Sequence, residues 1–346
     1  MTERTETNHE DPLSPAPVAE PHRDAEETWV LSRYADVTAA FREPKLSMGK
    51  GRGKESPELS DANRQQQIRS ETLEVISPAN LARWQEEAEL FAAELAGRLP
   101  RGRVVDAVQE FARPWSLRVA TFMTGADPTD SERLEGLARK VSLATADPSN
   151  PAHQSNAGEA NAELKRALAN SPIPMGGPAF VALSQTLPCF LANAWLALLR
   201  HPVEMDRLRS DPGLLPRAIE ELLRYAGIGQ RVTRYATGDV TLAGISIKQG
   251  DRVILALASA NRDPEQFPDP NRLDLTRRAT GHVAFGLGPH SCAAATLIRA
   301  MATVATWAFV KGFVEGPPKY VIAWEGGRGF RWASSLHVLV APSAEK

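Results

Sequence analysis

The spacing of apolar and polar positions changes along the chain from a helical period to a period of two. From about residue 64 to residue 200 the apolar residues recur at helical spacing, interrupted by the turn-forming sequences GADPTD and ADPSNPAHQSN. A further helix is predicted over 202–225, and it is followed by the predicted strands VTLAGISI and DRVILALASA around the turn KQGD. Helices first and short strands later, without βαβ alternation, predict a mainly α protein with small β-sheets (α+β).

Polar segments lie outside this pattern. Residues 1–26 are acidic and Pro-rich and hold few groups that could drive burial, so we expect a disordered tail followed by a single folded domain over 27–346. Residues 45–63 are rich in Gly, Lys, Glu and Ser, which indicates a mobile surface loop. Ser77 followed by Pro78 is typical of a helix N-cap and first helical position. The longest apolar run, 179–199, is interrupted by polar residues and a proline, which favours a buried helix over a membrane span.

Charge and cysteine content exclude several classes of protein. The 346 residues include 40 Lys and Arg against 42 Asp and Glu, a net charge of −2, which does not supply the basic field that a nucleic-acid binder needs. Two cysteines, Cys189 and Cys292, are too few for a disulfide framework or a structural zinc site. The N-terminus lacks the apolar stretch of a signal peptide, so we expect a cytoplasmic protein.

Cys292 lies in the segment with the most chemical information. It follows Gly286, Gly288 and Pro289 and precedes a strongly helical run, so its thiol is expected at a helix N-terminus, where the helix dipole favours an anionic sulfur. The glycines would let the backbone approach a flat ligand closely. From these residues alone, a cysteine that only fills space in the core is the commoner outcome.

The stretch FGLGPHSC, residues 285–292, resembles the heme-ligating signature of the cytochromes P450. Arg299 in the following helix stands where the family has it. Glu221 and Arg224, three residues apart on one helical face, together with Arg272 in FPDPNRLD, are similar to the family's buried Glu/Arg/Arg structural network. The resemblance extends from about residue 29 to residue 340 and implies a cytochrome P450 fold over the catalytic domain.

The resemblance implies a heme b cofactor. Its iron would take the Cys292 thiolate as axial ligand, the donor that favours O–O cleavage. By their positions in the matched motifs, Phe285, Gly286 and Ala182 would also lie against the heme.

Cations are expected to meet the two heme propionates. By position in the family, the candidates are Arg69, Arg234 and His290. Members of the family commonly carry His four residues before Arg69, and this chain has Gln65 there, so one propionate partner has become neutral.

The central helix departs from the family's Ala-Gly-x-(Asp/Glu)-Thr, because residues 182–186 read Ala-Leu-Ser-Gln-Thr. Leu183 replaces the Gly that opens a groove for dioxygen, and Gln185 replaces the acid that relays protons. An amide cannot donate and recover a proton near neutral pH. Thr186 and Gln185 are therefore the candidate catalytic residues, and Pro188 predicts a kink nearby.

Two further departures concern the helix beside the heme and the substrate side. Ala294 stands where the family usually has Gly after the ligand. The chain is short between the E and I helices of the family, from TGADPTD to the central helix, so the substrate cover is reduced, reshaped or completed by another chain. By position, Leu183, Gln230 and Val232 are predicted to line the substrate pocket. Leu183, Gln185 and Thr186 would face the distal side of the heme, and Gln230 and Val232 would lie where the strand after the Glu221 helix passes the substrate. For Leu183 and Val232, a position in the buried core is an equally good interpretation.

Three functions follow from the resemblance and its departures. The first is a heme-thiolate oxidoreductase of bacterial secondary metabolism that hydroxylates or couples a small natural-product intermediate, with electrons from ferredoxin and ferredoxin reductase. Arg299 and Arg69 on the proximal surface are compatible with an acidic redox partner. The second is a heme-thiolate enzyme that needs no redox partner and uses peroxide, transfers a nitrene, or catalyses a rearrangement or coupling. The third is a non-catalytic heme-binding partner protein, which the intact cysteine loop disfavours.

Overall fold

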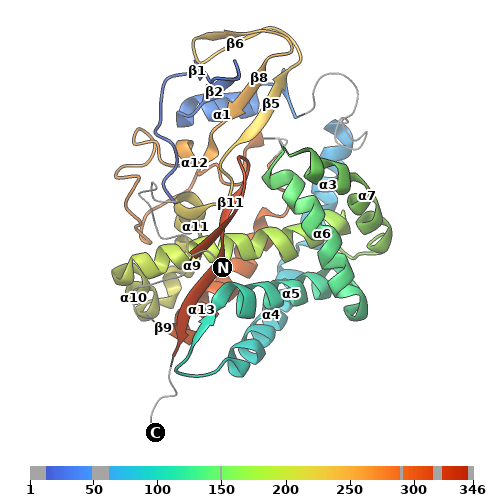
Figure 1. Cartoon of the computed structure of the whole chain (residues 1–346), viewed down its shortest axis with the longest axis vertical. Helices are drawn as coiled ribbons and strands as arrows, with labels where there is room; N and C mark the ends of the chain where they lie inside the picture. Colours follow the sequence, from blue (N-terminus) through green and yellow to red (C-terminus); the bar gives the residue numbers. More distant parts are fainter. Residues whose placement is uncertain (1–12, 49–61, 149, 289–290, 315–321, 342–346) are drawn as a thin grey trace.

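Helices dominate the structure, a computed structural model that describes residues 13–48, 62–148, 150–288, 291–314 and 322–341 (Figure 1). The predicted fold class, mainly α with small β-sheets, is confirmed. The α-helices are α1 (Tyr34–Arg42), α3 (Ala62–Val75), α4 (Pro78–Arg98), α5 (Arg113–Thr124), α6 (Ser131–Ala146), α7 (Pro151–Ala167), α8 (Gly176–Val181), α9 (Leu187–Arg200), α10 (Pro202–Ser210), α11 (Leu215–Ala226), α12 (Leu257–Ala260) and α13 (Ala295–Gly312). Short π- and 3-10 turns are η1 (Val108–Ala112), η2 (Pro128–Asp130), η3 (Ala182–Thr186) and η4 (Pro212–Leu214).

The described strands form three small sheets. The strands are β1 (His22–Arg23), β2 (Trp29–Leu31), β3 (Leu46–Ser47), β4 (Val104–Asp106), β5 (Val232–Ala236), β6 (Val240–Leu242), β7 (Ile245–Ile247), β8 (Arg252–Leu255), β9 (Phe313–Val314), β10 (Ile322–Gly326) and β11 (Arg331–Val340). The largest sheet has the order β1-β2-β8-β5-β3 and lies at the top of Figure 1. Strands β10, β11 and β4 form a second sheet, in which β9 also pairs with β11, and β6 and β7 form a hairpin.

Some element boundaries lie where the sequence predicted them, and others differ. Ser77 caps α4 as predicted, because its side chain accepts from the Asn80 N–H at 3.3 Å. The helix predicted over 202–225 is instead two helices, because Pro212 starts a short turn in which Asp211 Oδ1 accepts from the Gly213 N–H at 3.0 Å. The strand predicted in DRVILALASA ends at Leu255, and the helical turn α12 follows.

The predicted mobile loop over 45–63 has structure at both of its ends. Strand β3 pairs with β5 at one end, and α3 begins at Ala62 at the other. Residues 49–61 lie outside the described residues.

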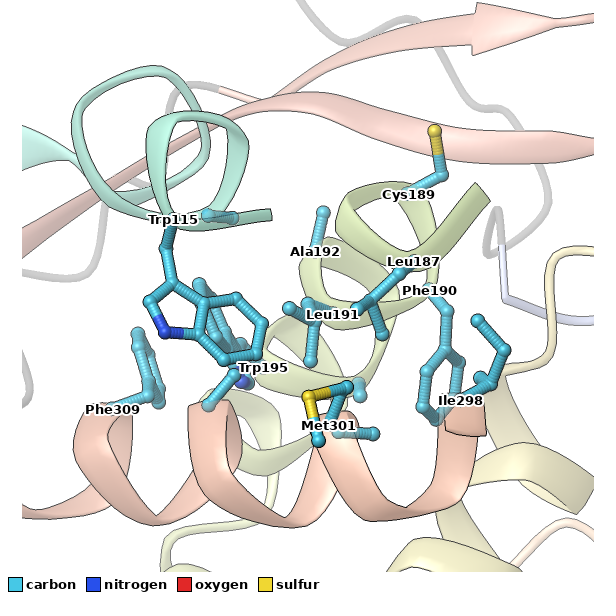
Figure 2. Close-up of a cluster of buried hydrophobic side chains, with 14 of the residues drawn as sticks. Trp115, Leu187, Cys189, Phe190, Leu191, Ala192, Trp195, Ile298, Met301 and Phe309 are labelled. Atoms are coloured by element: carbon cyan, nitrogen blue, oxygen red, sulfur yellow. The ribbon is translucent and has the colours of Figure 1, made fainter. Parts of the chain in front are cut away.

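Helix α9 forms the centre of the hydrophobic core, and every residue from Leu187 to Leu199 is buried. Figure 2 shows its side chains between those of α5 and α13, and Trp195 stacks on Phe309 with ring centroids 4.4 Å apart. The continuous helical run Gly176–Arg200 is long and apolar enough to cross a membrane by length and composition, but 83% of its apolar window is buried inside the molecule. It is therefore the core helix that the sequence predicted.

The segment 13–26, which we call the N-terminal strap, is ordered, so the predicted disordered tail is wrong for these residues. Leu13 is buried, and its carbonyl accepts from buried Arg262 at 3.3 Å. Ser259 Oγ donates to the Ala16 carbonyl at 2.8 Å, and β1 pairs with β2. The composition predicted disorder because the strap has no hydrophobic core of its own. It is held instead by polar groups of residues far along the chain. Residues 1–12 lie outside the described residues.

Candidate functional site

The loop that carries Cys292 is closed by its own backbone. The Cys292 N–H donates to the Phe285 carbonyl at 2.9 Å. Gly286 and Gly288 have φ of 67° and 71°, a left-handed conformation that glycine adopts without strain. At Gly288 a side chain would also meet the Phe41 carbonyl at 3.2 Å. The loop thus presents an exposed Cys292 immediately before α13, where a helix dipole favours negative charge.

The central helix is widened by the π-turn η3 between α8 and α9. The Leu187 N–H donates to the carbonyl of Ala182, five residues back, and Pro188, which has no N–H, follows directly. The predicted distortion near Pro188 is therefore a π-turn. Because π-turns often mark functional positions in helices, this segment is a candidate part of the site.

Some side chains of η3 are accessible and others are buried in the molecule. Ala182 and Thr186 are half-buried, whereas Leu183 is 0% and Gln185 4% exposed. The prediction that Leu183 and Gln185 face a pocket is therefore wrong: Leu183 belongs to the hydrophobic core, and the Gln185 amide lies 3.5 Å from Ser184 Oγ. Residues 182 and 186 are four positions apart and share the accessible side of the helix, while residues 183–185 are buried. Helices α5 and α6 pack against η3.

Arg234 on β5 is a buried cation available to an anion. It is 5% exposed, and burial lowers the pKa of its guanidinium. Its Nη1 donates to the Thr233 carbonyl at 3.0 Å, and its Cζ lies 5.3 Å from the Phe41 ring centroid. Within the described ranges no carboxylate forms an ion pair with Arg234. A buried guanidinium without an acid fits a ligand that brings its own carboxylate.

The donor set fits heme. Among the described residues no three His, Cys, Asp or Glu side chains converge on a common point, so Cys292 would act as a single protein ligand. One thiolate is what a porphyrin, which supplies four nitrogens itself, requires of the protein. Arg234 would hold a propionate. The side chain of Arg69 on α3, and the whole of His290, lie outside the described residues.

The structural network under the site contains a different arginine from the predicted one. Arg224 donates to both oxygens of Glu221, at 2.7 and 2.8 Å, and both side chains are fully buried. The third member is Arg277, whose Nε donates to Glu221 Oε1 at 3.1 Å. The prediction of Arg272 is wrong: its side chain is exposed and pairs with Asp274 at 3.4 Å, and it contributes only its backbone carbonyl to Arg224.

The two predicted pocket residues on the strand side have different surroundings. Gln230 lines a small cavity of about 20 Å³ beside Leu13 and Arg262. Val232 on β5 is half-buried, pairs with Leu255 and packs against the smaller of two hydrophobic clusters.

A turn that the sequence did not single out contacts both the end of α6 and the segment before β5. This hairpin turn, residues 326–330, links β10 and β11. The N–H groups of Gly329 and Phe330 donate to the Ala146 carbonyl at the end of α6, at 3.0 and 3.2 Å. The Gly329 carbonyl accepts from the Gln230 N–H at 2.8 Å. The sequence GGRGF could have indicated this turn, because closely spaced glycines let one backbone segment approach another closely.

Comparisons with known proteins agree with this geometry. A cytochrome P450 family profile matches residues 200–314, which include Glu221, Arg224 and Cys292. The chain is 30% identical to the vitamin D(3) 25-hydroxylase of Pseudonocardia autotrophica over 319 residues, 80% of this chain and 78% of that protein. It is 29% identical to cytochrome P450 107B1 of Saccharopolyspora erythraea over 338 residues, 84% and 82% of the two chains. The crystal structure of the LnmA cytochrome P450 hydroxylase from the leinamycin pathway of Streptomyces atroolivaceus matches with a TM-score of 0.75, 27% identity and 90% coverage of each chain.

Proposed function

Since this chain belongs to the cytochrome P450 family, we propose that it hydroxylates or oxidatively couples a small natural-product intermediate in bacterial secondary metabolism. Two of the similar proteins are a vitamin D(3) 25-hydroxylase and a cytochrome P450 hydroxylase from the leinamycin biosynthetic pathway. The observation that carries the proposal is the exposed Cys292, on a loop closed by the bond from its N–H to the Phe285 carbonyl. Buried Arg234, which pairs with no acid among the described residues, supports it.

The cofactor of this proposal is heme b. When bound, it supplies an iron centre that activates an oxidant for attack on a substrate bond. Cys292 would supply the thiolate ligand, Phe285 and Gly286 would shape the loop that holds it, and Ala182 would lie against the ring. Arg234 holds one propionate, and Arg69 and His290 are the proposed partners of the propionates from segments outside the described side chains.

Proton handling falls to Thr186 in this proposal. Thr186 is on the accessible side of η3, where its Oγ1 can donate a hydrogen bond and accept another. Gln185 is buried, and its amide does not release a proton near neutral pH. The π-turn thus carries a hydroxyl and no carboxylic acid.

The absence of an acid in residues 182–186 favours a second candidate. Where a positioned proton donor is lost, the dependent step slows by about 10²–10⁴-fold. An enzyme that takes peroxide, or an activated substrate, avoids part of that requirement and needs no ferredoxin.

The first experiment is the difference spectrum of the dithionite-reduced protein with and without carbon monoxide, for wild type and Cys292→Ala. We expect the red-shifted Soret band of thiolate ligation in wild type and its loss in the variant. Purification without heme, or a blue-shifted band in wild type, would overturn the heme-thiolate assignment.

A turnover assay separates the two candidates. We expect product to form at the expense of NADPH when surrogate ferredoxin and ferredoxin reductase are supplied. Product with peroxide or an activated substrate alone, and none with NADPH and the redox proteins, would favour the second candidate.

A further inference from the structure

A polar cluster from three separate segments lies next to the start of the Cys292 loop. Arg299 of α13 donates to both carboxylate oxygens of Glu220 on α11, at 2.5 and 3.0 Å. His282, three residues before Phe285, places Nε2 at 3.2 Å from Glu220 Oε2. We call Glu220, His282 and Arg299 the loop cluster.

The loop cluster is built as a fixed unit. The side chain of His282 is only 2% exposed, and its Nδ1 accepts from the Ala284 N–H at 3.2 Å, which leaves the ring proton on Nε2, facing Glu220. Burial acts to raise the pKa of Glu220, but the neighbouring His282 ring and the hydrogen bonds from Arg299 outweigh it and lower that pKa to about 2. The carboxylate therefore stays ionised at neutral pH and holds both partners.

The cluster reaches Cys292 through Phe285. The guanidinium of Arg299 lies over the Phe285 ring, with Cζ 4.7 Å from its centroid, and the His282 ring centroid is 6.1 Å from it. The Phe285 carbonyl is the acceptor for the Cys292 N–H. A movement of Phe285 would therefore move the acceptor that fixes the backbone of the ligand.

We propose that Arg299, Glu220 and His282 are positioning residues that fix Phe285 and thereby the orientation of the Cys292 thiolate toward heme iron. This inference rests on the proposed heme-thiolate function. It gives Arg299 a task different from docking a redox protein, because its guanidinium is already bound on two sides. Partners behind a metal ligand commonly govern how stably that ligand is held.

The test measures ligand stability separately from folding. The reduced carbon monoxide complex of each variant is held at fixed pH and temperature, and the conversion of the thiolate-type Soret band to the neutral-ligand band is followed in time. Arg299→Gln removes the charge, while Arg299→Lys keeps the charge but not the planar fork that binds two oxygens and stacks on Phe285. Arg217→Gln is the matched control, because Arg217 lies on α11, the helix that carries Glu220, but is exposed and among the described residues donates only to the Thr276 carbonyl.

We expect conversion about 10-fold faster in Arg299→Gln than in wild type, the lower end of what loss of a partner behind a metal ligand costs. Arg299→Lys should also convert faster than Arg217→Gln, with a thermal unfolding midpoint close to that of the control. If Arg299→Gln is not recovered folded, Glu220→Gln, which keeps the shape of the side chain, replaces it.

Two results would overturn the inference while leaving the proposed function standing. One is conversion at the control rate in both Arg299 variants. The other is faster conversion that occurs only together with loss of far-ultraviolet circular dichroism, which would make the cluster a general stabiliser. A wild-type protein without the thiolate-type band is a different outcome, since it contradicts the proposed function itself.

Discussion

Two cysteines in this chain have opposite surroundings. Cys189 lies inside α9 at 6% exposure, and burial raises the pKa of its thiol to about 12. Cys292 is exposed at the start of α13. Since the thiolate is the reactive form, the two should differ strongly in reactivity.

We therefore expect a thiol reagent at pH 8 to label Cys292 rapidly in the folded, heme-free protein and to reach Cys189 only after denaturation. Mass spectrometry of the labelled peptides checks this. Cys292→Ser should abolish the fast phase and leave the slow one, and rapid labelling of Cys189 in folded protein would contradict the packing of α9.

Glu221 and Arg272 provide a matched pair of substitutions. Glu221→Ala leaves Arg224 as a buried cation without its carboxylate, and breaking a buried pair in this way costs about 3–5 kcal/mol. Arg272→Ala removes an exposed side chain, for which changes stay within about 0.5 kcal/mol. Urea unfolding measures the free energy of unfolding of both variants. An equal decrease in the two would contradict the exclusion of the Arg272 side chain from the network.

At the scale of elements, the two π-turns share a sequence feature. Each ends two residues before a proline: η1 precedes Pro114, and η3 precedes Pro188. In both, the residue before the proline donates its N–H to the carbonyl five residues back. A proline cannot supply the next helical donor, so the wider turn is where the helix accommodates it.

The contact between the hairpin turn 326–330 and α6 gives the prediction at this scale. A Cβ at Gly329 would lie 2.8 Å from the Thr145 carbonyl oxygen, so Gly329→Ala should force the turn from α6 and lower the free energy of unfolding by about 1–3 kcal/mol. Gly136→Ala is the control in α6 itself, where a Cβ meets nothing within 4 Å and alanine should stabilise by about 0.5–1 kcal/mol. Urea denaturation and limited proteolysis near Ala146 test both variants. An unchanged free energy of unfolding in Gly329→Ala would show that the turn does not pack tightly against α6.

At the scale of the whole molecule, the N-terminal strap joins regions that are far apart in the sequence. It pairs with β2, accepts from Ser259 and Arg262, and its Glu26 forms ion pairs with Arg252 of β8 and Arg328 of the hairpin turn. The strap thus links the largest sheet to the turn that contacts α6.

Removal of residues 1–26 should therefore destabilise the protein by at least about 2 kcal/mol, since burial of one Leu side chain contributes about 1.5–3 kcal/mol. Arg262 would also lose the Leu13 carbonyl while remaining buried. Thermal unfolding of the truncated and full chains tests this, and Glu26→Gln in the full chain should have a much smaller effect because its ion pairs are exposed. An unchanged midpoint on truncation would mean that the strap contributes nothing to the fold.

The sequence by itself determined the features that depend on neighbours along the chain. The α+β class follows from periodicity, the Ser77 cap from adjacent residues, and the pair Glu221 and Arg224 from three-residue helical spacing. The glycine loop before Cys292 and the helix after it were found in the same way, because they are contiguous, whereas the resemblance to the cytochromes P450 singled out Cys292 as the ligand.

Only the tertiary structure decided the features that depend on distant residues. Arg277, and not Arg272, donates to Glu221 in the folded chain. The N-terminal strap is held by hydrogen bonds from Ser259 and Arg262. The tertiary structure also placed Leu183 in the core, because the helices that pack against the central helix decide which of its sides is covered. Contacts between segments far apart in the chain leave no local pattern, and those contacts set which side chains face the site.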